Sequence, residues 1–185
     1  DDGVDLPPPN QNSSQTKTFT IQTGAINDAP QFTLAQLEVT VPEDAEQFTN
    51  TPNTTIAGFA SDLLSGPASA IDEIGQQLSF EIVSVSAPEL FAVQPSLNAT
   101  NGNLTFTTAA NRNGKSLVVT RLLDDGTSAP LPNQNASGLR TFTINIEPVN
   151  DAPSFTLDSV SVAEDAGVIT RTGFAQNIRT GPAGT

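Results

Sequence analysis

The chain has 185 residues, of which 36% are apolar, and it carries 20 acidic against 7 basic residues, a formal charge of -13 at pH 7. It contains no Cys or His, which excludes disulfide bonds, thiol or histidine-based catalysis and zinc sites built on those ligands. The acidic excess argues against nucleic acid as a partner, because phosphate binding needs clustered Lys and Arg. The sequence contains no run of about 18 apolar residues, so it predicts no membrane span.

Short segments of alternating apolar and polar residues, separated by turn-forming residues, run through the middle of the chain. This period of two is typical of half-buried β-strands. It predicts seven strands, at about residues 32–41, 54–60, 78–85, 90–94, 103–108, 116–123 and 140–147. No segment has sustained helical spacing. We therefore expect an all-β fold, a seven-stranded antiparallel Greek-key β-sandwich between Asp28 and Val149.

The apolar positions of these strands also predict the core. In the segment Arg140–Glu147 alternate residues are apolar, and the same holds around Phe80 and Phe106. Since alternate side chains of a strand lie on one face, the apolar set should point between the sheets. The predicted core residues are Phe80, Ile82, Phe106, Phe142, Ile144 and Ile146.

One phrase occurs twice, INDAPQFTL from Ile26 and VNDAPSFTL from Val149, 123 residues apart. Further matches place Glu164-Asp165 opposite Glu43-Asp44 and Gly173-Phe174-Ala175 opposite Gly58-Phe59-Ala60. A period of this size corresponds to a whole domain, because solenoid repeats span about 20 to 50 residues. The sequence therefore predicts a tandem array of domains.

The register of the repeat divides the chain into three parts. Residues 1–28 match the C-terminal part of a preceding repeat, residues 29–149 form a complete repeat, and residues 150–185 match the N-terminal part of the next. We expect residues 1 and 185 to be cuts in a longer protein. The alternative is that the end strands complete modules in neighbouring chains.

Five short motifs follow one another through the complete repeat. They are Pro42-Glu43-Asp44, Asp72-Glu73-Ile74-Gly75-Gln76, Thr100-Asn101-Gly102-Asn103-Leu104, Leu122-Leu123-Asp124-Asp125-Gly126 and Asn150-Asp151-Ala152-Pro153. In this order they resemble the cadherin repeat, most closely the bacterial cadherin-like domains of large surface and adhesion proteins. The resemblance implies a cadherin or immunoglobulin-like sandwich, Ca²⁺ at the joints between repeats, and an extracellular or cell-surface location.

The motifs depart from the family pattern at three places, one of which is a linker with one Asn and one Asp fewer than the family's. The segment that matches an acidic ligand motif of cadherins, residues 109–114, offers only the neutral oxygens of Asn111 and Asn113. Asp72 and Glu73 are adjacent, whereas the family separates its two acids by one residue. The resemblance therefore implies one or two calcium ions per joint, fewer than in animal cadherins.

The acidic residues themselves favour a cation at the joints. Calcium binds about 6 to 8 oxygen atoms and prefers several carboxylates in one place. In a sandwich of this topology, the loops after the second and sixth strands lie at the same end as the N-terminal linker. The predicted metal ligands are Asn27, Asp28, Asp72, Glu73, Asp124 and Asp125 at one joint and Glu43, Asn150 and Asp151 at the other.

Other interpretations remain open at this point. Asp and Gly are common turn formers, NDAP can be a plain polar linker, and acidic excess can serve solubility alone. An enzyme is not expected, because the chain also lacks the Trp and Tyr of a sugar-binding cleft. We expect a calcium-stiffened spacer of an adhesin, stalk or filament, whose partners are neighbouring repeats, like chains or a cell-surface ligand. The alternative is a β-sandwich module that binds a carbohydrate or protein through its loops.

Overall fold

The structure, a computed structural model, describes residues 14–44 and 54–181, and these residues form an all-β protein. The outer ends of the two predicted partial repeats, residues 1–13 and 182–185, lie outside the described residues. Helical structure in the described part is limited to two 3-10 turns, η1 (Ile71–Glu73) and η2 (Pro88–Leu90). No helix of the described residues has the length and apolar character needed to cross a membrane.

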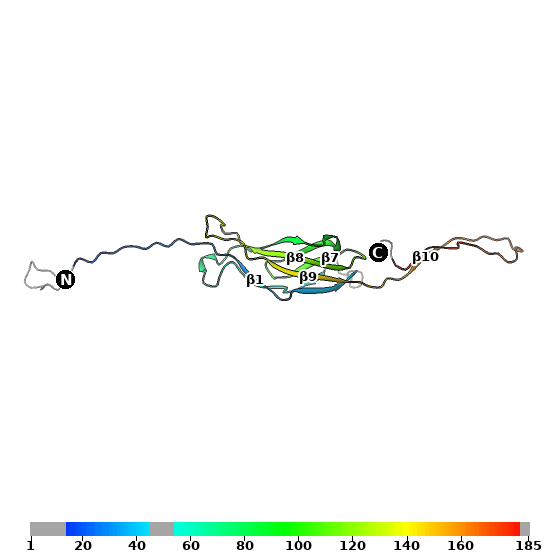
Figure 1. The fold of residues 1–185 in the computed structure, drawn as a ribbon, viewed down its shortest axis with the longest axis horizontal. Helices are drawn as coiled ribbons and strands as arrows, with labels where there is room; N and C mark the ends of the chain where they lie inside the picture. The colour runs from blue at the N-terminus through cyan, green and yellow to red at the C-terminus, as the bar shows by residue number, and fades with distance from the viewer. Residues whose placement is uncertain (1–13, 45–53, 182–185) are drawn as a thin grey trace, which may run out of the picture.

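A central body of nine described strands is followed by one further strand pair. The body contains β1 (Gln31–Leu34), β2 (Glu38–Pro42), β3 (Thr54–Ile56), β4 (Ala60–Leu64), β5 (Ser79–Val85), β6 (Phe91–Leu97), β7 (Leu104–Thr108), β8 (Gly114–Leu123) and β9 (Arg140–Glu147). The pair consists of β10 (Ser154–Leu157) and β11 (Ala175–Arg179). The chain enters the body as an extended segment at one end and leaves it at the opposite end (Figure 1).

The strands of the body form three sheets. A four-stranded sheet has the order β2-β9-β8-β5, a three-stranded sheet the order β3-β7-β6, and β1 pairs with β4. All of these pairs are antiparallel except β2 and β9, which run parallel with Val39 opposite Ile144 and Val41 opposite Ile146. In the four-stranded sheet, β2 is an edge strand and pairs with β9, the last strand of the body.

Two of the predicted strands are interrupted. The segment predicted as one strand at 32–41 contains β1 and β2, which belong to different sheets. The segment predicted at 54–60 contains β3 and the start of β4, which continues to Leu64. Gly58 lies between β3 and β4 with a φ of 60°, a left-handed conformation that glycine adopts at little cost. The prediction of single continuous strands at these two places was wrong, because the chain changes its pairing partner there.

One apolar core joins the sheets. The rings of Phe59, just before β4, and Phe142 of β9 lie 4.7 Å apart in an edge contact, and both are buried. The predicted core residues Phe106, Phe142, Ile144 and Ile146 are buried. The other two, Phe80 and Ile82, are half-buried and pack against the same core. Burial of the alternate residues of β9 confirms the period-two prediction for that strand.

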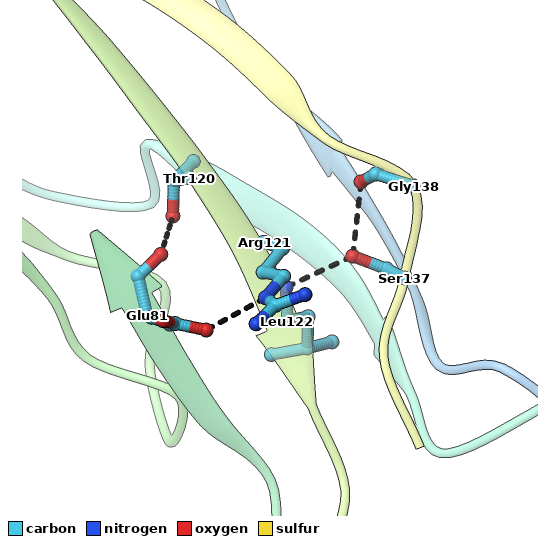
Figure 2. A network of polar contacts seen from close by, with 6 residues as sticks. All are labelled: Glu81, Thr120, Arg121, Leu122, Ser137 and Gly138. Atoms are coloured by element: carbon cyan, nitrogen blue, oxygen red, sulfur yellow. Dashed lines mark hydrogen bonds and ion pairs between the residues drawn. The ribbon is translucent and has the colours of Figure 1, made fainter. Parts of the chain in front are cut away.

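Polar contacts fasten the end of β8 to its neighbours (Figure 2). Thr120 donates from its hydroxyl to the Glu81 carbonyl over 2.9 Å, and Arg121 forms an ion pair of 2.6 Å with the Glu81 carboxylate. The Leu122 amide donates to the Ser137 hydroxyl, and the Ser137 amide donates back to the Leu122 carbonyl, both over 2.9 Å. These two hydrogen bonds attach the end of the loop between Asp124 and Ser137 to β8, the strand from which the loop begins.

The repeat seen in the sequence is also a repeat in the structure. β10 pairs with β11 as β1 pairs with β4: Ser154 opposes Arg179 and Leu157 opposes Ala175, at the positions of Gln31–Leu64 and Leu34–Ala60. Both pairs contain a register shift after the first of these positions. Matching residues Asp62 and Asn177 share a φ of 52°. The segment after the second linker therefore begins the same fold as the segment after the first.

Candidate functional site

The first linker meets two loops of the central body at one end of the protein. Asn27 and Asp28 directly precede the Ala29-Pro30 step into β1. Glu73 lies in η1, between β4 and β5, and Asp124 is the first residue after β8. Although these residues are far apart in the sequence, hydrogen bonds join them in the structure. We call this group the first joint.

Asn27 is the centre of the first joint. Its side-chain amide donates to Asp124 Oδ1 over 3.1 Å and to the Gln134 carbonyl over 2.7 Å, and its Oδ1 accepts from Gln76 Nε2 over 2.6 Å. Its main chain bonds the same loop, since Asn27 N donates to Asn133 Oδ1 and Gln134 N donates to the Asn27 carbonyl. Only 7% of Asn27 is exposed. The linker is therefore held by this one residue on several sides.

Two glycines provide the space for this arrangement. A Cβ atom on Gly126 would lie 1.9 Å from Asn27 Oδ1, and one on Gly66 would lie 1.8 Å from Glu73 Oε2. Contacts this short are impossible without displacement of a neighbour. Both glycines lie in phrases that occur twice in the sequence, Asp-Asp-Gly and Gly-Pro.

Three buried side-chain oxygens of the first joint lack a hydrogen-bond partner. They belong to Glu73, Gln76 and Asp124. The other carboxylate oxygen of Glu73 accepts from the Asp28 amide, and that of Asp124 accepts from Asn27 and from Gly126 N. Glu73 and Asp124 are only 2% and 6% exposed. Since a buried polar atom without a partner costs about 1–3 kcal/mol, three oxygens in one joint are an unusual concentration.

The remaining predicted ligands of the first joint lie at its surface. Asp28, Asp72 and Asp125 are exposed, and Asp125 accepts a hydrogen bond of 2.9 Å from the Gln77 amide. Asp72 lines a shallow pocket of about 270 Å³ together with Asn27, Glu73 and Gln76. In the described part of the chain, no three Asp or Glu side chains are grouped closely enough to hold a metal ion by themselves. The joint combines carboxylates with amides.

Basic side chains do not neutralise the first joint. The described residues form three ion pairs, Lys115–Glu38, Arg121–Glu81 and Arg171–Asp158, and none includes an acid of the joint. Arg121, the basic residue nearest to Asp124 in sequence, is engaged by Glu81 on β5. No ion pair of the described residues therefore opposes the negative charge of the joint.

The predicted residues of the second joint are only partly brought together. Glu43, directly after β2, is buried, and its two oxygens accept from the Val149 amide over 2.8 Å and from Asn113 Nδ2 over 3.1 Å. Asn150 is exposed and Asp151 half-buried, and no hydrogen bond described here joins either to Glu43. Glu43 thus holds Val149, the first residue of the second copy of the repeated phrase.

Sequence reasoning missed several residues of the two joints. Gln76, Asn133 and Gln134 complete the surroundings of Asn27, and buried Asp44 accepts a hydrogen bond of 3.0 Å from the Asn111 amide. A signal was present for most of them. The phrase Pro-Asn-Gln-Asn occurs at residues 9–12 and again at 132–135, and Glu43-Asp44 occurs again as Glu164-Asp165.

Comparison with known proteins found no relative of this chain. No protein-family model, no curated protein and no solved structure matches the chain.

Proposed function

We propose that the chain is part of a calcium-stiffened repeat protein, in which each domain is a spacer of an extracellular adhesin, stalk or filament. The observation that carries the proposal is the set of partnerless buried oxygens of Glu73, Gln76 and Asp124, all beside the linker. Oxygen is the ligand type that calcium prefers, and a cation bound there would satisfy atoms that the protein leaves without a partner.

The residues of the first joint suit such an ion in their chemistry. Glu73, Gln76 and Asp124 supply the buried oxygens, while exposed Asp72 lies on the same pocket as Glu73 and Gln76. Bound calcium supplies positive charge, and the chain's own residues determine where the linker lies.

The position of the joint supports a mechanical role. Glu73 accepts from the amide of Asp28, so a change at its carboxylate acts directly on the linker backbone. The body carries its own core of Phe59, Phe106, Phe142 and other apolar residues. We infer that calcium fixes the angle between consecutive domains and leaves the folding of each domain largely unchanged.

The proposed fold is a seven-stranded Greek-key sandwich of cadherin type. In this interpretation β1 with β2 is one interrupted strand, β3 with β4 is another, and the remaining five strands are continuous. The parallel β2–β9 pair and the antiparallel order of the other strands support it.

Small-angle scattering of a tandem protein with three copies of residues 26–149 tests this function. The maximum dimension should decrease when a chelator removes calcium, because like charges at the joints are then unopposed. The circular dichroism signal of the sheets should stay unchanged. An array that keeps its length in chelator would contradict the proposal, and loss of the sheet signal would show that calcium belongs to the fold itself.

A further inference from the structure

A groove lies on the central body between β1 and the start of β9. Two adjoining pockets of about 370 and 420 Å³ form it, and Phe32, Thr33 and Arg140 line both of them. Phe32 and Thr33 belong to β1, and Arg140 is the first residue of β9. Both walls of the groove therefore belong to the complete repeat, residues 29–149.

The β1 wall presents main-chain groups that have no strand partner. The Ala35 amide donates to the Phe59 carbonyl, on the side of β4. Because the N–H and C=O groups of successive residues in a strand point to opposite sides, those of Phe32 and Leu34 point away from β4. Among the described strands β1 pairs with β4 alone, so this edge of β1 is open.

The β9 wall is open in the same way. The Thr143 amide donates to the Leu37 carbonyl, and the pairing of β2 with β9 begins there, with Glu38 opposite Thr143. Thr141, two residues earlier, directs its main-chain groups to the same side, where β2 has not yet begun. An extended chain in the groove therefore meets unpaired main-chain groups on both sides. This is the arrangement by which a peptide adds a strand to the edge of a sheet.

Exposed apolar side chains lie beside these open edges. Leu37 and Leu139 line the second pocket and are 70% and 59% exposed, whereas Phe32 in the same pocket is buried. Apolar side chains of a bound strand would remove the two leucines from water, which favours binding. The groove therefore suits a strand that presents apolar residues on one face.

One basic side chain lies in the groove. Arg140 precedes the buried Phe142 by two residues in β9, so it lies on the inner face of that strand, and it lines both pockets. The three ion pairs of the described residues do not include Arg140. Asp62 lines the first pocket, whereas the described lining of the second contains no acid. A carboxylate in the second pocket would therefore meet Arg140 without a competing acid.

We propose that this groove binds an extended peptide segment of a partner protein, with apolar residues at alternate positions and a carboxylate among them. The peptide lies as an added strand between β1 and β9, and its carboxylate faces Arg140. The contact uses none of the acids of the first joint, so it goes beyond the proposed calcium site and does not depend on it.

Fluorescence anisotropy of the full chain in chelator tests the proposal separately from calcium binding. The Glu probe is a fluorescein-labelled nonapeptide of alternating Thr and Val in which one inner Val is replaced by Glu. It should bind saturably. The Lys probe, with Lys in place of Glu, should bind about tenfold more weakly, because its charge is repelled by Arg140. Arg140→Glu should invert this preference.

Further controls separate main-chain pairing from simple apolar adhesion. A Glu probe methylated at alternate amide nitrogens cannot donate hydrogen bonds to one wall and should bind far more weakly. Leu139→Asp should abolish binding, whereas Leu117→Asp, at an exposed residue on the outer face of β8, should leave it unchanged. Hydrogen exchange should slow at the amides of Leu34 and Thr141 when the Glu probe is bound.

Absence of saturable binding by the Glu probe would overturn the proposal. Equal affinity for the Glu and Lys probes would also overturn it, as would a bound probe that leaves the amides of Leu34 and Thr141 unprotected. Sedimentation of the chain alone tests the other occupant. A dimer that Leu139→Asp dissociates would assign the groove to a second copy of this chain and contradict the proposal. All of the substituted residues are exposed, so the melting temperature checks that each variant remains folded.

Discussion

The side-chain amide of Asn27 donates a buried hydrogen bond of 3.1 Å to the carboxylate of Asp124, 97 residues further along the chain. Through this contact the linker before the first strand is attached to the loop after β8. The same asparagine also contacts Gln76 and Gln134, so the linker position depends on one short side chain. The phrase that contains Asn27 occurs twice in the sequence, and its second copy contains Asn150. The two asparagines have different surroundings and can therefore be compared.

Asn27→Ala should loosen the first linker. The substitution removes three side-chain hydrogen bonds and leaves buried partners unsatisfied, which should lower the free energy of unfolding by about 1–3 kcal/mol. Hydrogen exchange should accelerate at the amide of Gln134, which donates to the Asn27 carbonyl. Asn150→Ala is the matched control, because Asn150 is exposed and should lose almost nothing. Equal effects of the two substitutions would mean that the Asn27 contacts do not hold the linker.

Gly126→Ala should destabilise the joint through the same asparagine. The new Cβ would lie 1.9 Å from Asn27 Oδ1, so Asn27 must move, at a cost of about 1–3 kcal/mol. Gly138→Ala is the control, because its Cβ would meet no atom within 4 Å. In the double variant with Asn27→Ala, the cost of Gly126→Ala should largely vanish, since the colliding atom is gone. Additive costs in denaturant unfolding would argue against this explanation.

Much of the fold could be predicted from the sequence, because alternation of apolar residues records which face of a strand is buried. The pattern located β9 and its buried residues and excluded long helices. It did not show that β1 and β2 belong to different sheets. The apolar positions change phase between Leu34 and Ala35, but the local pattern does not encode which strand lies alongside each part.

The candidate site was predicted only in part, because local sequence does not show which residues the tertiary structure brings together. Glu73, Asp124 and Glu43 stand out as acids in short motifs, and all three are buried. Gln76 and Asn133 were missed because a chain rich in amides offers many equivalent candidates, and only the tertiary structure selects among them. The second linker also differs from the first: Val149 contacts Glu43, whereas Asn150 and Asp151 have no hydrogen bond to it.

Glu43→Gln should weaken the attachment of the second linker. Both oxygens of Glu43 accept hydrogen bonds, so an amide NH₂ group must face one of the donors. A loss of about 1–3 kcal/mol in the free energy of unfolding is expected, with faster hydrogen exchange at the Val149 amide. Glu38→Gln, at an exposed ion pair with Lys115, should change stability by less than about 1 kcal/mol. Unchanged protection of Val149 in the Glu43 variant would contradict the assignment.

The repeat counterparts Phe142 and Phe19 should respond differently to truncation. Phe142→Ala removes a buried ring that contacts Phe59, which should cost about 3–5 kcal/mol. Phe19→Ala should leave the melting temperature of a dilute sample unchanged, because Phe19 is exposed. Thermal unfolding followed by circular dichroism measures both. A large loss for Phe19→Ala would mean that the segment around Phe19 packs on the central body.

Isothermal titration calorimetry of the full chain with calcium tests the proposed calcium site. We expect binding with a dissociation constant of about 10⁻⁴ to 10⁻³ M, typical of extracellular calcium sites. Asp124→Asn and Glu73→Gln should each remove this binding heat. Each substitution converts to a neutral amide a carboxylate that carries a buried oxygen without a hydrogen-bond partner. Glu164→Gln, at an exposed acid, should leave the heat unchanged. A wild-type chain that releases no heat, or a Glu73→Gln variant that binds as the wild type does, would show that calcium does not bind at the first joint.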